Sequence, residues 1–572
     1  MAGAAPPAAR PATCAGGAAD VHHRVALLHP LLIAGVPALS LAAENPGQYR
    51  FTDLLTVLGV VVLGAGLALA AATFVLRRWE RSARAEQLAA MLVTVAVFWF
   101  FHYLGISRTL QRTPWLAPPR GALPLVLLAS VAAVALLARR PAALAAVNRV
   151  VAIAGAILVG MLGVRVAGHQ LLAARAVAGS QLVRSLAAPV PVGAVPAGRN
   201  DPRRDIYLVV LDTRINSAVL RERFGASDAP FEDSLRALGF TIPRDMQSNY
   251  AQSVVSLASI LNFEHVTRLA VDVGPDSRDY SLPRHLVAHN RAARFLKGQG
   301  YKYVFFPSSW YSLTERSPTA DEQFEARTEL DLVDELRRTE FRRRLVRSTM
   351  LMKSPRARAA NYAEPTHYFR SFDGLARLAE DTAPTFAFAH FLLPHAPFLV
   401  DEECRPSARP LLTGLELDTP EVRAGYLAQL RCTNRLVLDF ATTVLRRSPT
   451  PPIILIVGDH GTQLTDPGFW ARPDRVSAEF VRERFGAFGA FYAPDGGDTL
   501  FAGRVTLVNV LRQVLRHYFG AALPLASDAQ FISGDLLYRF YRRDRLRLVE
   551  RPGAARAAAA QAAPPSSGRA ND

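Results

Sequence analysis

The stretch from Ile453 to Gly461 reads IILIVGDHG, and it decides how the rest of the chain is interpreted. Five consecutive apolar residues, four of them β-branched, predict a strand that is buried on both faces of a sheet. Asp459 and His460 follow Gly458 where this strand would end, and ligands collect at the carboxyl ends of strands in open α/β sheets. By itself the motif is more typical of an ordinary loop, so the prediction of a site depends on partners elsewhere.

Two other predicted strands end on side chains of the same kinds. Asp212 directly follows the strand 206–211 (IYLVVL), and His390 lies near the end of the strand 385–391 (TFAFAHF). His395 follows in a proline-rich loop, where the prolines restrict the backbone. Singly, an Asp after a strand is often a cap and a loop histidine is usually solvated.

The rest of the carboxyl-terminal part alternates between strands and helices. The further predicted strands are 239–242 and 301–306, and the predicted helices are 231–238, 290–299 and 423–445. We therefore expect a mostly parallel sheet covered by helices on both faces.

Ser253 precedes a run with helical periodicity and therefore lies at a predicted helix amino terminus. The free N–H groups and the helix dipole at such a position favour an alkoxide and an anionic substrate. The alternative is a serine that only caps the helix.

Five apolar segments precede this α/β pattern, at about residues 25–43, 53–76, 87–104, 121–138 and 150–168. Each is near the ~20 residues that a helix needs to cross ~30 Å of hydrocarbon. We expect five parts of the chain: a disordered start (1–20), a transmembrane domain of about five helices (21–170), a linker (171–204), an extracytoplasmic α/β domain (205–550) and a disordered tail (551–572).

The arginines predict the orientation in the membrane. The loops after the second and fourth apolar segments contain seven arginines: Arg77, Arg78, Arg81, Arg84, Arg139, Arg140 and Arg149. The alternate loops contain four: Arg50, Arg108, Arg112 and Arg120. The side with more arginine is expected to be cytoplasmic, which places everything after the fifth segment outside. We expect a multi-pass protein of the bacterial cytoplasmic (inner) membrane with an extracytoplasmic carboxyl-terminal domain.

The net charge of +17 does not by itself indicate nucleic acid as a partner, because the basic residues are scattered and nearly all are arginine. One run, 337–347 (RRTEFRRRLVR), is most often a solvated helix face, and anionic lipid head groups would also suit it. Of the three cysteines, Cys404 and Cys432 lie in the soluble part. They form either a disulfide, if that part is extracytoplasmic, or two free thiols.

The order of these motifs resembles the alkaline phosphatase and sulfatase superfamily. The chain is more narrowly similar to bacterial membrane-anchored sulfatase-like proteins, which include lipoteichoic acid synthases and phosphoethanolamine transferases. The resemblance covers about residues 205–535 and includes SNYAQSVVSLASILN at 248–262 and VTLVNVLRQVLRHYFGAALPL at 505–525.

The resemblance implies that Asp212, Asp459 and His460 hold one divalent metal together with the oxygen of Ser253, which is the implied nucleophile. Thr213 stands where many sulfatases have a second Asp, which argues for one metal and not two. The ligand set suits Zn or Mn, and Ca or Mg would also bind such oxygens. His395 and His390 are implied to contact the substrate oxygens or the leaving group.

The departures from the sulfatase pattern favour phosphoryl chemistry. Val255 and Leu257 replace the Pro and Arg of the motif that directs formylglycine formation, so we expect Ser253 to remain a serine. The predicted function is a membrane-bound, metal-dependent phosphotransferase or phosphodiester hydrolase acting on a lipid-linked or glycan substrate. The alternatives are a sulfatase acting on sulfated glycans and a catalytically silent membrane scaffold.

Overall fold

The computed structural model describes residues 27–80, 82–111, 119–193, 204–308, 314–324, 339–354, 366–411, 417–543 and 547–548. The expected disordered ends, 1–20 and 551–572, lie outside these residues. The chain divides into two compact units, each treated separately below. The membrane unit comprises Met1–Asn45, Tyr49–His169 and Asp331–Tyr362, and the sheet unit comprises Pro46–Gln48, Gln170–Leu330 and Ala363–Asp572.

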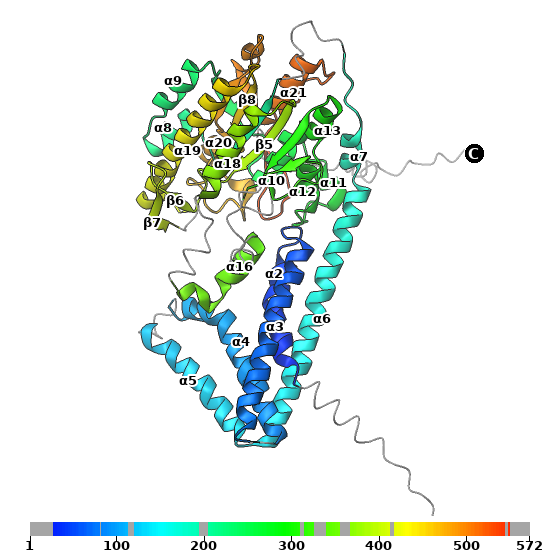
Figure 1. Ribbon diagram of the computed structural model, residues 1–572, viewed down its shortest axis with the longest axis vertical. Coiled ribbons are helices and arrows are strands. Elements are labelled where there is room, and N and C mark those ends of the chain that lie inside the picture. The colour runs from blue at the N-terminus through cyan, green and yellow to red at the C-terminus, as the bar shows by residue number, and fades with distance from the viewer. Residues whose placement is uncertain are drawn as a thin grey trace, which may run out of the picture. The chain divides into compact units, whose positions relative to one another are not determined.

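The membrane unit is helical, as the apolar segments predict (Figure 1). Its helices are α2 (His29–Glu44), α3 (Phe51–Arg77), α4 (Ala83–Gln111), α5 (Pro119–Ala138) and α6 (Pro141–Gly179). Within the described residues, α3, α4 over Ala83–Ser107 and α6 are long and apolar enough to cross a membrane, whereas α2 and the part Pro124–Ala138 of α5 are shorter. Large apolar side chains on α3 and α6 are exposed, which suits helices whose outer surfaces face lipid.

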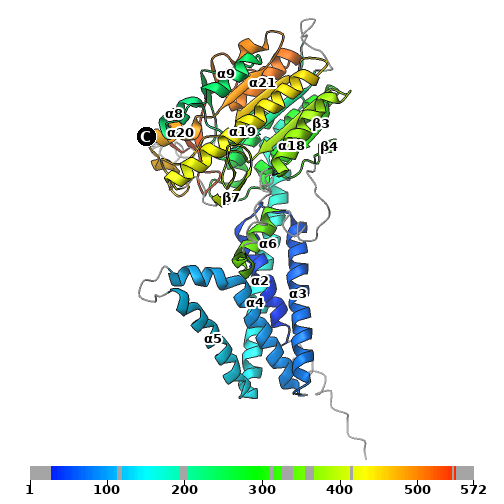
Figure 2. The same ribbon diagram turned by 60° about the vertical axis from the view of Figure 1, so that its left-hand side comes forward.

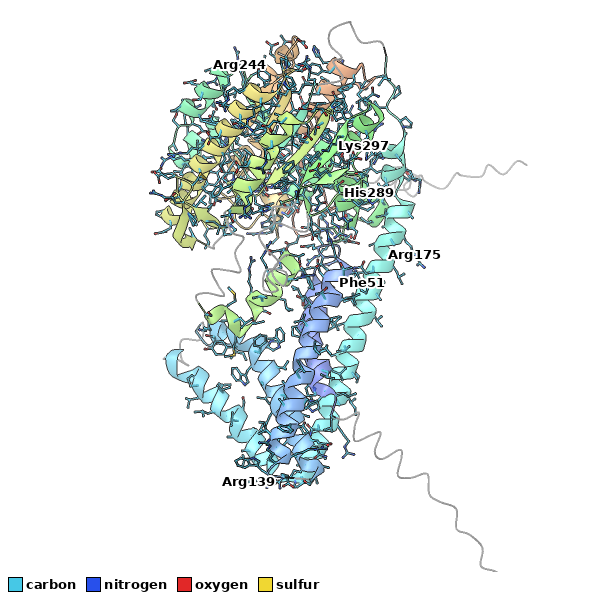
Figure 3. The ribbon with its side chains drawn as sticks, viewed as in Figure 1. Phe51, Arg139, Arg175, Arg244, His289 and Lys297 are labelled. Atoms are coloured by element: carbon cyan, nitrogen blue, oxygen red, sulfur yellow. A yellow bond between two sulfur atoms is a disulfide. The ribbon has the colours of Figure 1, made fainter. Side chains whose placement is uncertain are left out.

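The arginine-rich connections of this unit share one end. The Arg84 guanidinium donates a hydrogen bond to the carbonyl of Ala138, which joins the first turn of α4 to the last residue of α5. Figure 3 shows Phe51 and Arg139 at opposite ends of the helices. The described arginines of these two connections therefore cluster at the end away from Phe51.

The sheet unit contains a six-stranded sheet with the order β4-β3-β5-β1-β8-β9. Its strands are β1 (Ile206–Leu211), β3 (Lys302–Phe306), β4 (Glu322–Gln323), β5 (Thr385–Phe391), β8 (Ile453–Gly458) and β9 (Gly489–Tyr492). All neighbours are parallel except β8 and β9. The mostly parallel sheet predicted from the sequence is confirmed.

One predicted strand is wrong. Residues 239–242 form only a single bridge, between Thr241 and Phe491, and the next strand is β2 (Asp245–Gln247). Pro243 explains the difference, because proline has no N–H to continue a ladder. β2 pairs instead with β10 (Arg504–Thr506), outside the main sheet.

Helices cover both faces of the sheet (Figure 2). One face packs against α10 (Ser253–Asn262), α12 (Ser281–Ala288), α13 (Arg291–Gly298) and α21 (Leu507–Phe519). The other packs against α9 (Ala229–Ala237), α18 (Thr366–Arg377) and α19 (Pro420–Arg447). Every residue of β1 is buried, as its unbroken apolar run predicts.

Shorter elements complete the two units. The helices are α7 (Gln181–Ala187), α8 (Ser217–Phe224), α11 (Leu269–Val273), α16 (Glu340–Ser348) and α20 (Ala478–Phe485), with 3-10 turns η2 (Met350–Lys353), η3 (Leu378–Glu380), η4 (Pro473–Arg475) and η5 (Gly497–Phe501). The strands are β6 (Phe398–Val400), β7 (Pro406–Leu411), β11 (Phe531–Ile532), β12 (Tyr541–Arg542) and β13 (Arg547–Leu548).

The register of the central strands brings the candidate site together. β1 lies between β5 and β8, with Val210 opposite His390 and Leu211 opposite Gly458. The residues that follow β1 and β8, together with the end of β5, therefore reach the same edge of the sheet. Only glycine fits at 458, because a Cβ atom there would lie 2.1 Å from the carbonyl oxygen of Arg214.

Candidate active site

Three side chains at this edge form a compact group of metal-ligating atoms. One ligand atom each from Asp212, His390 and Asp459 lies within 4.8 Å of the others, and all three residues are buried. The Nε2 atom of His390 is 3.7 Å from Oδ2 of Asp212. His390 was expected to contact the substrate oxygens or the leaving group, which stays a prediction, and the structure groups it with two of the implied metal ligands.

Four atoms of this group are buried without a hydrogen-bond partner: Oδ1 and Oδ2 of Asp212, Oδ2 of Asp459 and Nε2 of His390. Leaving such atoms unsatisfied is costly, and native proteins rarely do so without a ligand. Two carboxylates and an imidazole are suitable ligands for a divalent cation. The residues present therefore fit the metal that the motifs imply.

The raised pKa values of Asp212 and Asp459 also fit a cation site. Burial raises the pKa of Asp212 to about 7, and burial together with the nearby charge of Asp212 raises the pKa of Asp459 to about 8. A carboxyl with a raised pKa is one whose charge is poorly compensated. A bound cation would supply that compensation.

Thr314 fixes the orientation of His390. Nδ1 of His390 is 2.8 Å from the hydroxyl oxygen of Thr314, and that hydroxyl donates to the hydroxyl oxygen of Ser308 at 2.7 Å. Nδ1 therefore carries the proton and donates it, which leaves the lone pair of Nε2 directed at the carboxylates. Burial lowers the pKa of His390 to about 3, so the ring is neutral.

Ser253 is the first residue of α10, and its hydroxyl lies at the site. Oγ of Ser253 is 2.8 Å from Nε2 of His460. Gln252 occupies the N-cap position, and its amide donates to the carbonyl oxygens of Ser533 and Gly534, both at 2.9 Å. The structure thus places Ser253 inside the helix start and not in the capping position that was the alternative.

His460 presents the same nitrogen to two groups. Its Nδ1 donates to the carbonyl oxygen of Gly461 at 3.0 Å, so Nε2 carries the lone pair. That lone pair faces the Ser253 hydroxyl and also Nη2 of Arg484, at 3.3 Å. Asp459 is fixed through Oδ1, which accepts from the N–H groups of Thr213 at 3.0 Å and His460 at 2.9 Å.

Arg484 is a site residue that the sequence did not reveal. It lies at the end of α20, and its guanidinium donates to the carbonyl oxygens of Ala251 at 2.8 Å and Gly461 at 2.7 Å. Burial lowers its pKa to about 10, so it remains a cation beside the two carboxylates. No motif surrounds it in the sequence, and only the fold brings α20 to the site.

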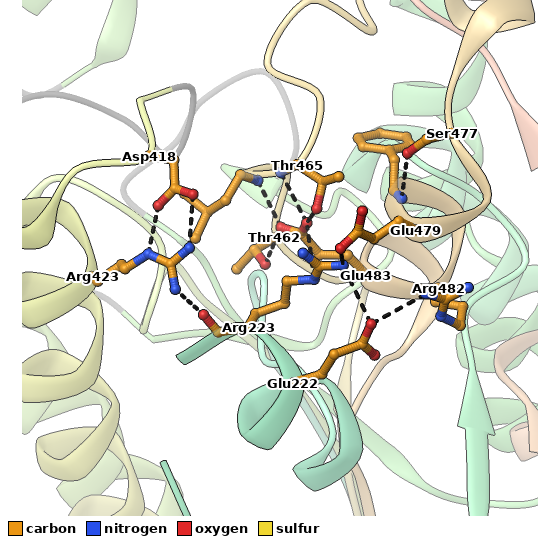
Figure 4. Close-up of polar contacts among 12 residues, drawn as sticks. Glu222, Arg223, Asp418, Arg423, Thr462, Thr465, Ser477, Glu479, Arg482 and Glu483 are labelled. Carbon is orange, nitrogen blue, oxygen red and sulfur yellow. Dashed lines mark hydrogen bonds and ion pairs between the residues drawn. The ribbon is translucent and has the colours of Figure 1, made fainter. Parts of the chain in front are cut away.

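The neighbouring Glu483 holds the loop that follows His460 (Figure 4). Its carboxylate accepts from the hydroxyl of Thr462 and the N–H of Leu464, both at 2.6 Å, and from the N–H of Thr465 at 3.0 Å and the hydroxyl of the same residue. Gly461 is required here, because a Cβ atom would lie 1.9 Å from the Glu483 carbonyl oxygen. The last turn of α20 therefore fixes residues 460–465 from both sides.

His395 lies half-buried in the loop after β5. Gln429 of α19 holds this loop, because its amide donates to the carbonyl oxygens of Pro394 at 3.2 Å and His395 at 2.7 Å. Electrostatic repulsion from His395 contributes to the lowered pKa of both His390 and His460, behind the larger effect of burial. The expected contact of His395 with the substrate or leaving group stays a prediction.

Cys404 and Cys432 form a disulfide. The bond joins the β6–β7 segment to α19, the helix that also carries Gln429. Of the two alternatives for these cysteines, the structure has the disulfide, which is typical of a domain outside the reducing cytoplasm.

Comparison with known proteins returns structural likenesses only. No family model matches the chain, and no curated protein sequence matches it. The zinc complex of the C-terminal periplasmic domain of EcEptC from Escherichia coli shares 12% identity over 64% of this chain and 99% of its own, with a TM-score of 0.41. The integral membrane protein lipooligosaccharide phosphoethanolamine transferase A from Neisseria meningitidis shares 14% sequence identity with this chain. The match covers 88% of this chain and 96% of the transferase, with a TM-score of 0.34.

A protein in the alkaline phosphatase superfamily from Vibrio parahaemolyticus shares 13% identity over 64% of this chain and 82% of its own, with a TM-score of 0.37. The case for a function rests on the residues of this chain. Within the described residues, the chain itself has three helices long and apolar enough to cross a membrane, and an α/β unit with a six-stranded sheet.

Proposed function

We propose that this protein is a membrane-bound, metal-dependent phosphotransferase or phosphodiester hydrolase that uses Ser253 as a covalent nucleophile. One observation carries the proposal most directly. The Ser253 hydroxyl lies at the amino terminus of α10 and 2.8 Å from Nε2 of His460, beside carboxylate oxygens that have no partner. A helix start favours an anionic substrate, and a neighbouring lone pair can take the hydroxyl proton.

Asp212 and Asp459 would hold one divalent cation, Zn or Mn by the nature of the ligands, with an imidazole and the oxygen of Ser253 completing the set. A bound divalent cation supplies a low pKa for a coordinated hydroxyl and neutralises charge on a phosphoryl oxygen. The imidazole comes from His390, whose Nε2 has no partner, or from His460, whose lone pair faces Ser253.

The chain's own residues account for the bonds that form and break. The oxygen of Ser253 attacks phosphorus as its proton leaves, and the phosphorus–oxygen bond to the alcohol of the donor breaks. His395 donates a proton to that departing oxygen. Water or an acceptor hydroxyl then attacks the phosphorus as His395 takes its proton back from that nucleophile, and the Ser253 oxygen leaves as the proton it lost in the first step returns to it.

Arg484 adds a fixed positive charge where the phosphoryl group would lie. Two of its nitrogens are committed to backbone carbonyls, so the group is held rigidly. Nη2 is directed at His460 Nε2, on the side of Ser253. A preorganised cation of this kind stabilises negative charge that develops during transfer.

The direct test is Ser253→Ala in the purified full-length protein, supplied with Zn or Mn and assayed with bis(p-nitrophenyl) phosphate. We expect turnover to fall by on the order of a thousandfold or more, because a nucleophile cannot be replaced by a methyl group. Ser259→Ala is the matched control on the same helix, since its hydroxyl only bonds the carbonyl of Glu264. Undiminished turnover in Ser253→Ala removes this serine from the mechanism.

The two candidate imidazole ligands are distinguished by metal retention. If His460 binds the cation, His460→Ala loses the metal and His390→Ala retains it. If His390 binds the cation, the results are reversed, and His460 is then the group that takes the Ser253 proton.

We propose that the sheet unit faces the periplasm or cell exterior and acts on an envelope lipid or glycan. The disulfide and the arginine-rich end of the membrane unit support this orientation. Sulfatase action is the competing activity. Mass spectrometry of the peptide that contains Ser253 decides between them, because formylglycine at this position favours a sulfatase and an unmodified serine favours phosphoryl transfer.

A further inference from the structure

The backbone carbonyl of Asp459 lies one residue beyond β8, in the buried interior of the sheet unit. The pairing of β8 with β1 ends at Gly458, and a buried carbonyl outside a ladder needs a donor from elsewhere. Two buried serine hydroxyls provide it, because Oγ of Ser256 donates to this oxygen at 2.8 Å and Oγ of Ser248 at 2.7 Å. The turn that carries Asp459 and His460 is therefore tied to α10 and to the segment before it.

Ser256 lies three residues after Ser253 in α10, and side chains at this spacing share one face of a helix. The two hydroxyls meet consecutive residues of the same turn. Oγ of Ser253 is 2.8 Å from Nε2 of His460, and Oγ of Ser256 bonds the carbonyl of Asp459. A rotation or a slide of α10 that separates Ser253 from His460 would therefore also break the Ser256 bond.

Ser248 is held independently of α10, because its N–H donates to the carbonyl of Phe485 at 2.8 Å. Its hydroxyl lies 2.7 Å from two carbonyl oxygens, those of Asp459 and Tyr250, and a hydroxyl has one proton to share between them. Within the described residues, the Ser256 hydroxyl donates to Asp459 only. Ser256 is thus the main donor to this carbonyl, and Ser248 can take over from it.

The side chain of Asp459 is fixed as well. Its Oδ1 accepts from the N–H groups of Thr213 and His460, whereas Oδ2 has no hydrogen-bond partner among the described residues. Because the carbonyl and Oδ1 are both held, the backbone sets the direction of Oδ2. The two serines therefore determine where this carboxylate oxygen lies relative to the Ser253 hydroxyl.

We propose that Ser256 and Ser248 are positioning residues for the reaction proposed above, on which this inference rests. They act through the carbonyl of Asp459, which is their shared acceptor. That link holds the turn with the metal ligands against α10 and keeps the Ser253 oxygen beside His460 and the carboxylates. Both hydroxyls donate to backbone oxygens, so their role is geometric and not chemical.

The test uses the full-length protein loaded with Zn and assayed with bis(p-nitrophenyl) phosphate. Ser256→Ala should lower kcat about tenfold and leave KM nearly unchanged, because a displaced nucleophile still binds substrate but reacts slowly. Ser248→Ala should have the smaller effect. The double variant should lose more than the product of the two single losses, because either serine can donate when the other is absent. Ser259→Ala, whose hydroxyl bonds the carbonyl of Glu264, is the matched control and should keep the wild-type kcat.

Zn affinity gives a second measurement that needs no turnover. Competition with a chromogenic chelator, begun from metal-free protein, should show binding about tenfold weaker in the double variant and unchanged in Ser259→Ala. Serines with a merely structural role would lower the melting temperature in the double variant and in Ser259→Ala alike, with no selective loss of kcat or Zn affinity.

Wild-type kcat in Ser256→Ala, additive losses in the double variant, or wild-type Zn affinity in the double variant overturns the proposal. If the double variant does not fold, kcat and Zn affinity of Ser256→Ala decide it. Ser253→Ala separates this inference from the proposed function. Undiminished turnover in that variant overturns the proposed function, whereas the Zn affinity of the serine variants still tests their positioning role.

Discussion

The buried carboxylates Asp212 and Asp459 have surroundings that differ from those of a third buried carboxylate in the sheet unit, Glu483. Glu483 accepts four hydrogen bonds from residues 462–465, so both of its oxygens are satisfied (Figure 4). Asp212 has no partner on either oxygen, and Asp459 has none on Oδ2. All three side chains are almost completely buried.

The difference separates a structural carboxylate from a ligand. A buried charge is tolerated when hydrogen-bond donors surround it, as they surround Glu483. Asp212 and Asp459 lack those donors, and the pKa of each is raised accordingly. We infer that the sheet edge is built for a cation, whereas the Glu483 environment is built to hold a loop. Each prediction below tests one side of this contrast.

The largest effect is expected from Asp459→Asn. The amide cannot balance a divalent cation, and loss of metal assistance is worth several kcal/mol, or on the order of a thousandfold in turnover. Hydrolysis of bis(p-nitrophenyl) phosphate by the full-length protein measures it. Asp498→Asn, on an exposed turn, is the control. Turnover within threefold of the wild type would show that Asp459 is not a functional ligand.

Arg484→Gln should cost about a hundredfold in turnover, because it removes a preorganised positive charge from the site. Metal content should remain near that of the wild type, which separates this effect from loss of a ligand. Arg482→Gln changes an exposed arginine on the same helix and is the matched control. If Arg484→Gln loses its metal as well, the role assigned to Arg484 is wrong.

Thr314→Val should weaken metal binding by about 10- to 100-fold, because the hydrogen bond that orients His390 is lost while the shape of the side chain is kept. Competition with a chromogenic chelator gives the affinity. The prediction depends on His390 being a ligand. An unchanged affinity would assign the imidazole ligand to His460 instead.

The smallest effect concerns pH and the metal-free protein. Because the folded-state pKa values of Asp212 and Asp459 lie above the ordinary range, the folded protein holds protons that the unfolded chain has released. The free energy of unfolding of the metal-free protein should therefore fall as the pH rises from about 4 to about 8. Thermal melting across this range should show the decline, and saturating Zn or Mn should raise the melting temperature more at pH 8 than at pH 6. A melting temperature that rises with pH in the metal-free protein would contradict the assignment.

Much of the fold could be predicted from the sequence, because local patterns of apolar residues determine the central strands. The unbroken apolar runs predicted β1, β5 and β8, and parallel pairing brought Asp212, His390 and Asp459 to one edge. The failed strand at 239–242 had the right composition, but Pro243 and the competing pair of β2 and β10 decided otherwise. A single sequence does not show which of two neighbouring segments will pair with another strand.

The remaining site residues could not be predicted, because only the packing of distant segments brings them to the site. Arg484 and Gln429 lie on amphipathic helices whose charged residues look like any solvated face, and only packing turns them to the site. The pairing of α16 with the membrane helices is similar, since Asp53 and Arg342 are nearly three hundred residues apart in sequence. No local pattern could have joined them.

The most direct test of the central claim is the metal content of the full-length protein after stripping, reloading with Zn or Mn and desalting. The contrast between the two sets of carboxylates predicts about one ion per chain in the wild type and in folded Glu483→Gln, and almost none in Asp212→Asn. A wild type that retains no ion, or an Asp212→Asn variant that retains as much as the wild type, would contradict the account.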